Sequence, residues 1–195
     1  MFKSQILSTF KKVAFALGLT SIFAFPLGAQ AQNWPDKPIK LVIPFSAGGT
    51  TDILGRILAR EMAPIIGQTI IVENKGGAGG NIGAQIVANS PADGYTLLLA
   101  SGSMMTVNPY LYKSLPLDYG TDLSYITTVA GGPMVVSVNP KLPVNNVKEL
   151  IALAKTKDLN FGSAGIGSQV HMAGENFTYS AGINATHIPY KGEAP

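Results

Sequence analysis

The sequence predicts an α/β protein built from two successive blocks of strands and helices. Short apolar runs, typical of strands buried on both faces, alternate with segments in which apolar residues recur every three or four positions. In each block, a loop of small residues lies between a predicted strand and a predicted helix. Open α/β sheets bind their ligands at this place, so these two loops are the first candidates for a functional site.

The first block contains three predicted strands and two predicted helices. Residues 40–45 (KLVIPF) form a nearly continuous apolar run, and the apolar residues between Ile53 and Ile65 share one helix face that ends at Gly67. The pattern then repeats, with a strand at 69–73, a glycine loop at 76–80, a helix at 81–88 and a strand at 95–100.

The second block follows a proline-containing stretch at residues 115–122. We expect a first lobe at residues 32–130 and a second lobe at residues 131–195. Asn145 or Asn146 is expected to cap the first helix of the second block. The predicted elements are strands at 124–129, 134–138, 159–163 and 185–189, and helices at 146–154 and 169–180.

The beginning of the chain has the pattern of a secretory signal peptide. Three lysines precede an apolar stretch at residues 13–25, and Ala29-Gln30-Ala31 is a small-x-small cleavage pattern. The apolar stretch is shorter than the ~20 residues of a membrane-spanning helix, which argues against an anchor. We therefore expect residues 1–31 to be removed by cleavage between Ala31 and Gln32, and the mature protein to be exported.

Charge and composition exclude several classes of function. The chain has 14 basic and 11 acidic residues, and three of the lysines lie in the leader, which leaves 11 of each sign scattered through the mature part. The sequence contains no basic patch of the kind that binds nucleic acid. The absence of cysteine removes thiolate catalysis and cysteine metal sites, and His171 and His187 do not form an HExxH pair. We expect neither a metal nor a cofactor.

The first loop, residues 46–49 within IPFSAGGTTD, has the composition of an anion site. Its small side chains leave the backbone amides from Ala47 to Thr50 free to turn toward a ligand, and the following helix adds positive potential at its N-terminus. The second loop, residues 164–168 (AGIGS), occupies the equivalent place in the second block. Each loop alone is also compatible with an ordinary tight turn, but two together predict a carboxylate held from both sides.

Enzyme motifs fit poorly. The sequence contains no GxSxG elbow, and Ile82 stands where the third glycine of a dinucleotide fingerprint belongs. A secreted α/β hydrolase or transferase remains an alternative, with Ser168 and His171 three residues apart on one helix turn. No suitably placed acid accompanies that pair.

Five motifs together resemble one family. WPDKPIKLVIPFSAGGTTD, VENKGGAGGNIGA, PADGYTLLLAS, NFGSAGIGSQVHMAGENF and HIPYKGEAP occur in this order from Trp34 to Pro195. They resemble the Bug/TctC-type extracytoplasmic solute receptors, the substrate-binding proteins of tripartite tricarboxylate transporters. The resemblance implies a two-lobed type II periplasmic-binding-protein-like α/β fold, a non-enzymatic monomer, a small carboxylate ligand and the membrane components of a transporter as partners.

By this resemblance, the ligand-binding residues come from both loops. Asp52 either favours the helix start or faces a water, hydroxyl or amine of the ligand, and His171 either packs behind the loop or contacts the ligand. Ser101 and Gly102, after the third strand, are weaker candidates. The predicted set is Phe45, Ser46, Ala47, Gly48, Gly49 and Asp52 in the first lobe, and Ser163, Ala164, Gly165, Gly167, Ser168 and His171 in the second.

The resemblance also implies that the two-lobed fold is incomplete in this chain. The family continues beyond the HIPYKGEAP motif, through the rest of the second lobe and back into the first. A sheet without its returning strands exposes edges and core faces, which favours aggregation. We therefore expect the binding residues to be present in a chain that folds or binds less well than a longer one.

Overall fold

The computed structural model describes residues 33–193. The predicted signal peptide at residues 1–31 lies outside this range, as does its cleavage point. From Pro35 onward, the described chain contains two parallel sheets, one of three strands and one of two. The mixed α/β architecture agrees with the predicted fold class.

The three-stranded sheet is formed by the strands predicted for the first block. β1 (Ile39–Ile43) lies in the centre, between β2 (Ile70–Asn74) and β3 (Thr96–Leu98), and both pairings are parallel. Val42 and Ile43 are fully buried because helices cover both faces of the central strand. The prediction that the first and third strands share one sheet is confirmed.

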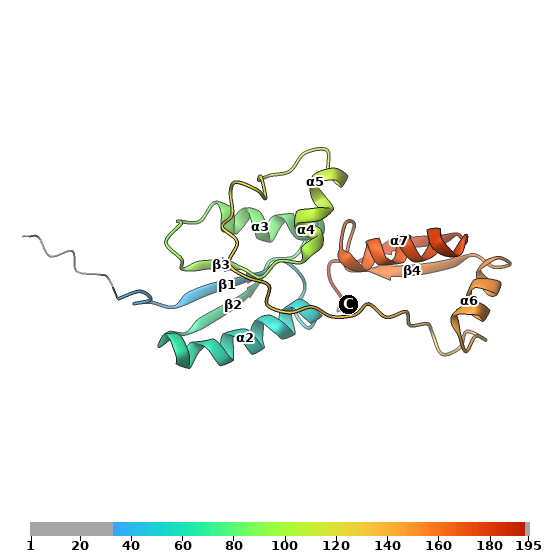
Figure 1. Cartoon of the computed structure of the whole chain (residues 1–195), viewed down its shortest axis with the longest axis horizontal. Coiled ribbons are helices and arrows are strands. Elements are labelled where there is room, and N and C mark those ends of the chain that lie inside the picture. The colour runs from blue at the N-terminus through green and yellow to red at the C-terminus, as the bar shows by residue number, and fades with distance from the viewer. Residues whose placement is uncertain (1–32, 194–195) are drawn as a thin grey trace, which may run out of the picture. The chain divides into compact units, whose positions relative to one another are not determined.

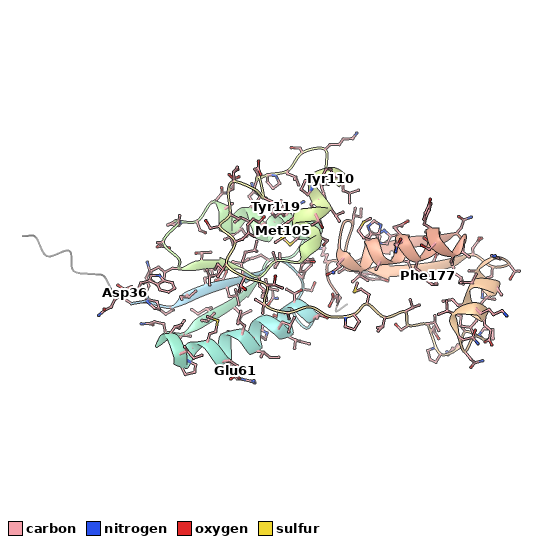
Figure 2. All side chains as sticks on the ribbon, in the orientation of Figure 1. Asp36, Glu61, Met105, Tyr110, Tyr119 and Phe177 are labelled. Carbon is pink, nitrogen blue, oxygen red and sulfur yellow. The ribbon has the colours of Figure 1, made fainter. Side chains whose placement is uncertain are left out.

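Helices lie on both sides of this sheet (Figure 1). α2 (Thr50–Ile66) starts directly after the first loop and ends at Gly67, whose φ of 71° is the left-handed conformation that glycine adopts readily. Its exposed residues include apolar ones, such as Ile65 at 81%, as well as polar ones, and Glu61 projects from it away from the sheet (Figure 2). The other side carries the short turn η1 (Ala78–Gly80) and α3 (Asn81–Ala88), which agrees with the predicted helix.

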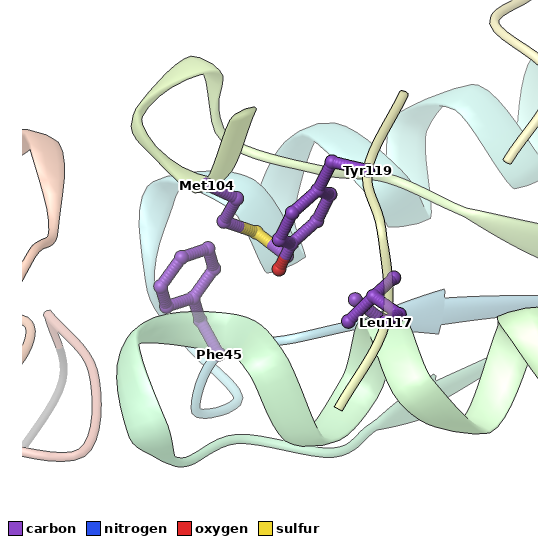
Figure 3. Packing of buried hydrophobic residues seen from close by; sticks show 5 residues of the cluster. Phe45, Met104, Leu117 and Tyr119 are labelled. Carbon is purple, nitrogen blue, oxygen red and sulfur yellow. The ribbon is translucent and has the colours of Figure 1, made fainter. Parts of the chain in front are cut away.

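Two short helices that the sequence did not predict close the core on the side of α3. They are α4 (Gly102–Thr106) and α5 (Asn108–Leu111), and both follow β3. Met104 of α4 is fully buried against Phe45 and Tyr119 (Figure 3). Burial also raises the pKa of Tyr119 to about 12, and its hydroxyl donates a hydrogen bond to Asn81 Oδ1 at 2.7 Å.

The second sheet pairs β4 (Leu159–Ser163) with β5 (Ala185–Pro189). α6 (Val147–Ala154) precedes it, and α7 (Gln169–Ala181) connects the two strands as a crossover helix. Asn146 caps α6 by accepting a hydrogen bond from the Glu149 amide, and Glu149 in turn accepts one from the Asn145 amide. This arrangement resembles a capping box, although the backbone N–H bound by Glu149 is that of Asn145, the residue before the cap, and Asn146 is the capping residue of the predicted pair.

The strands predicted at residues 124–129 and 134–138 are wrong. Residues 124–138, the connecting segment, form no regular element, and neither sheet of the described chain includes them. Ile126 and Val135 are 78% and 84% exposed. Their β-branched and apolar composition fits a strand, but a strand forms only where a neighbour pairs with its backbone, and the segment has no such neighbour within residues 33–193.

Within residues 33–193, no helix combines the length and apolar character needed to cross a membrane.

Candidate functional site

The first loop is closed by the buried carboxylate of Asp52. The backbone N–H of Gly48 donates to Asp52 Oδ2 at 2.9 Å, Arg56 Nε donates to the same oxygen at 3.0 Å, and Asn74 donates to Oδ1 at 2.9 Å. Asp52 is 3% exposed. Its hydrogen bond with Arg56 is the main cause that lowers its pKa to about 2, followed by those with Gly48 and Asn74, against the opposing effect of burial.

These contacts favour one of the two interpretations of Asp52. Both carboxylate oxygens are engaged by donors of the protein itself, at the start of α2, where a negative charge is stabilised by the helix dipole. The left-handed glycine of the loop is Gly48, with φ of 84°, whereas Gly49 has an ordinary φ of −77°. Asp52 therefore shapes the loop and holds the Gly48 amide.

A second carboxylate, that of Glu193, contacts the N-terminus of α2 directly after the first loop. The backbone N–H of Thr50, the first residue of α2, donates to Glu193 Oε2 at 2.7 Å. Ser46 Oγ donates to the Lys191 carbonyl oxygen at 3.1 Å. The segment that follows β5 therefore lies against the first loop. Two of the amides proposed for a ligand, those of Gly48 and Thr50, donate to protein carboxylates.

The start of the second loop is organised around Ser163, the last residue of β4. The Gly165 amide donates to Ser163 Oγ at 3.1 Å, and Ser163 Oγ lies 2.6 Å from His187 Nε2. Because the contact with His187 is the shorter of the two available to the hydroxyl proton, we assign His187 Nε2 as the acceptor. Ser163 and Ala164 are both buried.

The end of the second loop caps α7. Ser168 Oγ accepts a hydrogen bond from the His171 amide at 3.2 Å, and the Gly167 amide donates to His171 Nδ1 at 3.2 Å. An accepting Nδ1 places the proton of neutral His171 on Nε2, which lies 3.5 Å from Glu175 Oε1. These contacts favour the packing role among the two interpretations given for His171.

Two histidine rings stack beneath this loop. The ring centroids of His171 and His187 lie 3.9 Å apart, and Phe161 stacks against His187 at 5.0 Å. Burial lowers the pKa of His187, and the neighbouring His171 lowers it further. A lowered pKa favours the neutral form of His187 and so supports the hydrogen bond that Ser163 makes to it.

The proposed nucleophile and base of the hydrolase alternative do not form a catalytic pair. Ser168 Oγ contacts the backbone amide of His171 rather than its ring, and His171 Nδ1 is occupied by the Gly167 amide. Ser168 and His171 therefore both stabilise the N-terminus of α7. In the described chain, the serine that contacts a histidine ring is Ser163.

Residues of α5 and its C-terminal end contact the second loop. Tyr112 OH donates to the Ile166 carbonyl at 3.0 Å. A Cβ atom at Gly167, where φ is 81°, would lie only 2.7 Å from Asn108 Oδ1, so glycine is required by both conformation and space. Asn108 is fully buried and donates to Gly79 O and Asn81 Oδ1, while its own Oδ1 accepts no hydrogen bond within the described residues.

A cavity of about 400 Å³ opens beside the second loop. Ser163 and Ala164 line one part of it, and Tyr190 and Glu193 line another. Ser163 and Ala164 belong to the predicted set, whereas Tyr190 and Glu193 do not. The cavity is lined by Gly162, Ser163, Ala164, Val170, Tyr190, Gly192 and Glu193.

The predicted residues other than Ser163 and Ala164 do not line this cavity, and three of them lie outside both loops and the helices that follow these loops. Phe45 packs in the core with Met104 (Figure 3), and its backbone oxygen accepts a hydrogen bond from Asn74. Ser101 precedes α4 and its hydroxyl lies 3.1 Å from that of Ser103. Gly102 has open space around it. A ligand contact by any of the three stays a prediction.

Sequence reasoning missed His187, Tyr190 and Glu193, although all three belong to the quoted motif HIPYKGEAP. The available signal was the parallel pairing of β4 with β5, which brings the C-terminal ends of both strands to one edge. In the described part of the chain, no three histidine or acidic side chains gather in a way that would hold a metal ion.

A family model matches most of this chain. The "Tripartite tricarboxylate transporter family receptor" model, TctC, matches residues 54–195. The chain belongs to this family. TctC proteins are receptors rather than enzymes, so the family assignment disfavours the hydrolase alternative.

Relatives with known sequences agree with the TctC assignment. A UPF0065 protein of Bordetella pertussis is 42% identical over 168 residues, and BugT of the same organism is 40% identical over 168 residues. Each match covers 85% of this chain and 52% of the relative. The chain therefore spans about half the length of the relatives that it matches.

Solved structures show the same fold. Rpa4515 of R. palustris, solved with adipate, matches with a TM-score of 0.81 at 37% identity, and the periplasmic binding protein BugD with 0.65 at 35%. MatC of Rhodopseudomonas palustris, solved with bound malate, matches with 0.69 at 26%. These matches cover 82–83% of this chain and 55% of each neighbour. The α/β fold is thus that of a periplasmic binding protein.

Proposed function

We propose that this TctC-family chain takes part in capturing a small carboxylate in the periplasm and delivering it to the membrane components of a tripartite tricarboxylate transporter. The family match supports the receptor role, and the adipate and malate in two neighbours support the ligand class. The proposal includes an exported, monomeric receptor with a first lobe at residues 32–130 and a second at 131–195.

The observation that carries the proposal is the carboxylate at the start of α2. Glu193 accepts a hydrogen bond of 2.7 Å from the Thr50 amide, a length typical of a charge-assisted bond. The amide after the first loop is therefore oriented toward a carboxylate, that of Glu193, at the edge of the proposed site. The cavity next to it, bounded by Ser163 and Ala164, has the volume of a small-molecule site.

We propose that the ligand lies between the two loops. Ser46, Ala47 and Gly49 would approach it from the first, and Ser163 and Ala164 would line the opposite side. Gly48, Asp52, Gly165, Gly167, Ser168 and His171 would hold the loops in shape through the hydrogen bonds or close packing described above.

Calorimetric titration of this chain with a carboxylate panel that includes adipate and malate, over a concentration range wide enough to detect weak binding, tests the proposal. Binding should also raise the melting temperature, because a ligand at a hundred times its dissociation constant stabilises a protein by about 2.7 kcal/mol. Ala164→Val adds two methyl groups to the cavity wall and should weaken binding at least tenfold. Ala181→Val makes the same change at the end of α7, outside the cavity lining, and should leave affinity unchanged.

Two results would contradict the proposal. One is the absence of heat and of thermal stabilisation with every carboxylate, in a chain whose circular dichroism shows that it is folded. The other is equal loss of affinity in Ala164→Val and Ala181→Val, because a cavity site predicts a difference between the two positions.

A further inference from the structure

The Glu193 side chain lies at the position that the first loop offers to an anion. Its Oε2 accepts from the Thr50 amide at 2.7 Å, and a Cβ atom added to Gly49 would lie 3.5 Å from the same oxygen. The backbone around Glu193 is held there, since Ser46 donates to the Lys191 carbonyl and a Cβ at Gly192 would lie 2.6 Å from Ser46.

This contact places a second negative charge beside the first loop. Asp52 already holds the Gly48 amide, and its charge is balanced by Arg56. In the described chain, no ion pair is found for Glu193, whose charge is met by the Thr50 amide at the positive end of the 17-residue helix α2. A ligand carboxylate at the same amide would have to displace Glu193 and would then lie near two carboxylates.

Glu193 also faces the cavity beside the second loop. Among the residues that line this cavity, Glu193 is the one that carries a formal charge at neutral pH. The remaining wall is formed by glycines, Ser163, Ala164, Val170 and Tyr190. At the Glu193 end of the cavity, a cationic group of a ligand is stabilised and a neutral group is tolerated. A ligand carboxylate there is repelled.

We propose that Glu193 is a specificity-determining residue. It supplies one carboxylate of the site itself, and so selects ligands with a single carboxylate and a neutral or cationic opposite end over dicarboxylates. The ligand carboxylate then lies toward Ser163 and Ala164, and its other end faces Glu193. This inference rests on the proposed function, and it names the ligand class that this site takes.

Three six-carbon probes separate the alternatives, because they differ in one terminal group. Adipate has two carboxylates, hexanoate has one carboxylate and a methyl group, and 6-aminohexanoate has one carboxylate and an ammonium group. By calorimetry, the unmodified chain should bind 6-aminohexanoate at least tenfold more tightly than adipate, with hexanoate between them. Glu193→Gln should reduce this ratio at least tenfold, mainly by improving adipate binding.

Glu61→Gln is the matched control, because it removes the same charge from an exposed position on α2 that projects away from the sheet (Figure 2). Its preference among the three probes should equal that of the unmodified chain. If Glu61→Gln changes the ratio as much as Glu193→Gln, the effect comes from net charge and the proposal is wrong.

A measurement without ligand tests the contact itself. In ¹H–¹⁵N spectra, the Thr50 amide proton should move upfield in Glu193→Gln, because it loses a charged acceptor, while the amides of β1 stay in place. An unchanged Thr50 resonance overturns the proposal. The proposal is also overturned if the unmodified chain and Glu193→Gln show the same preference between adipate and 6-aminohexanoate. The proposed function would then still stand. If no carboxylate binds any variant, the proposed function fails and the inference falls with it.

Discussion

The Asp52 carboxylate accepts a hydrogen bond from the backbone N–H of Gly48 at 2.9 Å, so that an acid within the first turn of α2 closes the loop that precedes it. Arg56, one turn further along the helix, donates to the same oxygen. The three groups form a small clamp, which fixes the left-handed conformation of Gly48 and orients the first loop before any ligand arrives.

Replacing Asp52 with Asn should lower the free energy of unfolding by about 1 kcal/mol at pH 7, since Arg56 is half exposed and solvent screens part of the attraction. The folded pKa of about 2 lies below the ordinary value of 3.8. The contribution of Asp52 is therefore complete above about pH 4 and is lost as the pH falls toward 2. Urea unfolding at several pH values measures this loss.

The difference between the unmodified chain and Asp52→Asn should shrink as the pH falls from about 4 and vanish below the folded pKa of about 2. Glu61→Gln, which changes an exposed surface pair, should show a much smaller difference at every pH. A gap between the unmodified chain and Asp52→Asn that keeps its size down to pH 2 would contradict the clamp.

The stacked histidines predict a second pH dependence, at higher pH. Because the folded pKa of His187 lies below its unfolded value near 6.5, the unfolded chain binds more protons as the pH falls. The contribution of neutral His187 to stability is therefore complete above about pH 7 and decreases below it. The decrease should amount to less than about 1 kcal/mol, or a few degrees in melting temperature, because His187 is only partly buried.

His187→Gln removes the titrating group and keeps a side chain that can hydrogen bond to Ser163. Its melting temperature should therefore change less between pH 7.5 and 5.5 than that of the unmodified chain. His171→Gln removes only the neighbouring imidazole and should have an intermediate effect. Parallel melting curves for all three proteins would show that the stack does not titrate in this range.

Gly167→Ala should destabilise the chain by about 1–3 kcal/mol, because it combines an unfavourable φ of 81° with a Cβ that would lie 2.7 Å from Asn108 Oδ1. Gly131→Ala is the matched control, since no atom lies within 4 Å of its added Cβ and its φ is not positive. Equal melting temperatures for the two variants would argue against the close contact between α5 and the second loop.

The local elements of this fold could be predicted because their patterns are local. Hydrophobic periodicity placed α2, and Gly67 marked its end. The short helices α4 and α5 were missed because four or five residues are too few to show a helical period. The connecting segment was misassigned because strand formation depends on a pairing partner, which composition does not reveal.

The candidate site could be predicted only in part, because some of its contacts join residues that lie far apart in the sequence. Small residues after a strand indicated both loops, and Asp52 lies close in sequence to the glycine that it holds. Glu193 is 143 residues away from Thr50, and His187 is 24 residues away from Ser163. Those contacts depend on the pairing of β4 with β5 and on the course of the chain beyond β5, neither of which a motif spacing contains.

The connecting segment gives the last prediction, which concerns local stability. Residues 124–138 have no strand partner in the described chain, whereas every residue of β1 is paired with β2. An amide that needs no unfolding step to reach water exchanges rapidly, while an amide in a central strand exchanges only through larger openings. Hydrogen exchange in the segment should therefore be at least about a hundredfold faster than in β1.

The exposed side chains of the same segment should promote association. Ile126 and Val135 are among the most exposed large apolar residues of the described chain, and unpaired apolar backbone is a template for intermolecular pairing. Val135→Lys should therefore raise the highest concentration at which light scattering still shows a monomer, with little change in melting temperature. Val42→Lys, which buries the same charge in β1, should instead prevent folding. Slow exchange in the segment, or loss of stability in Val135→Lys, would mean that residues 124–138 are packed in solution.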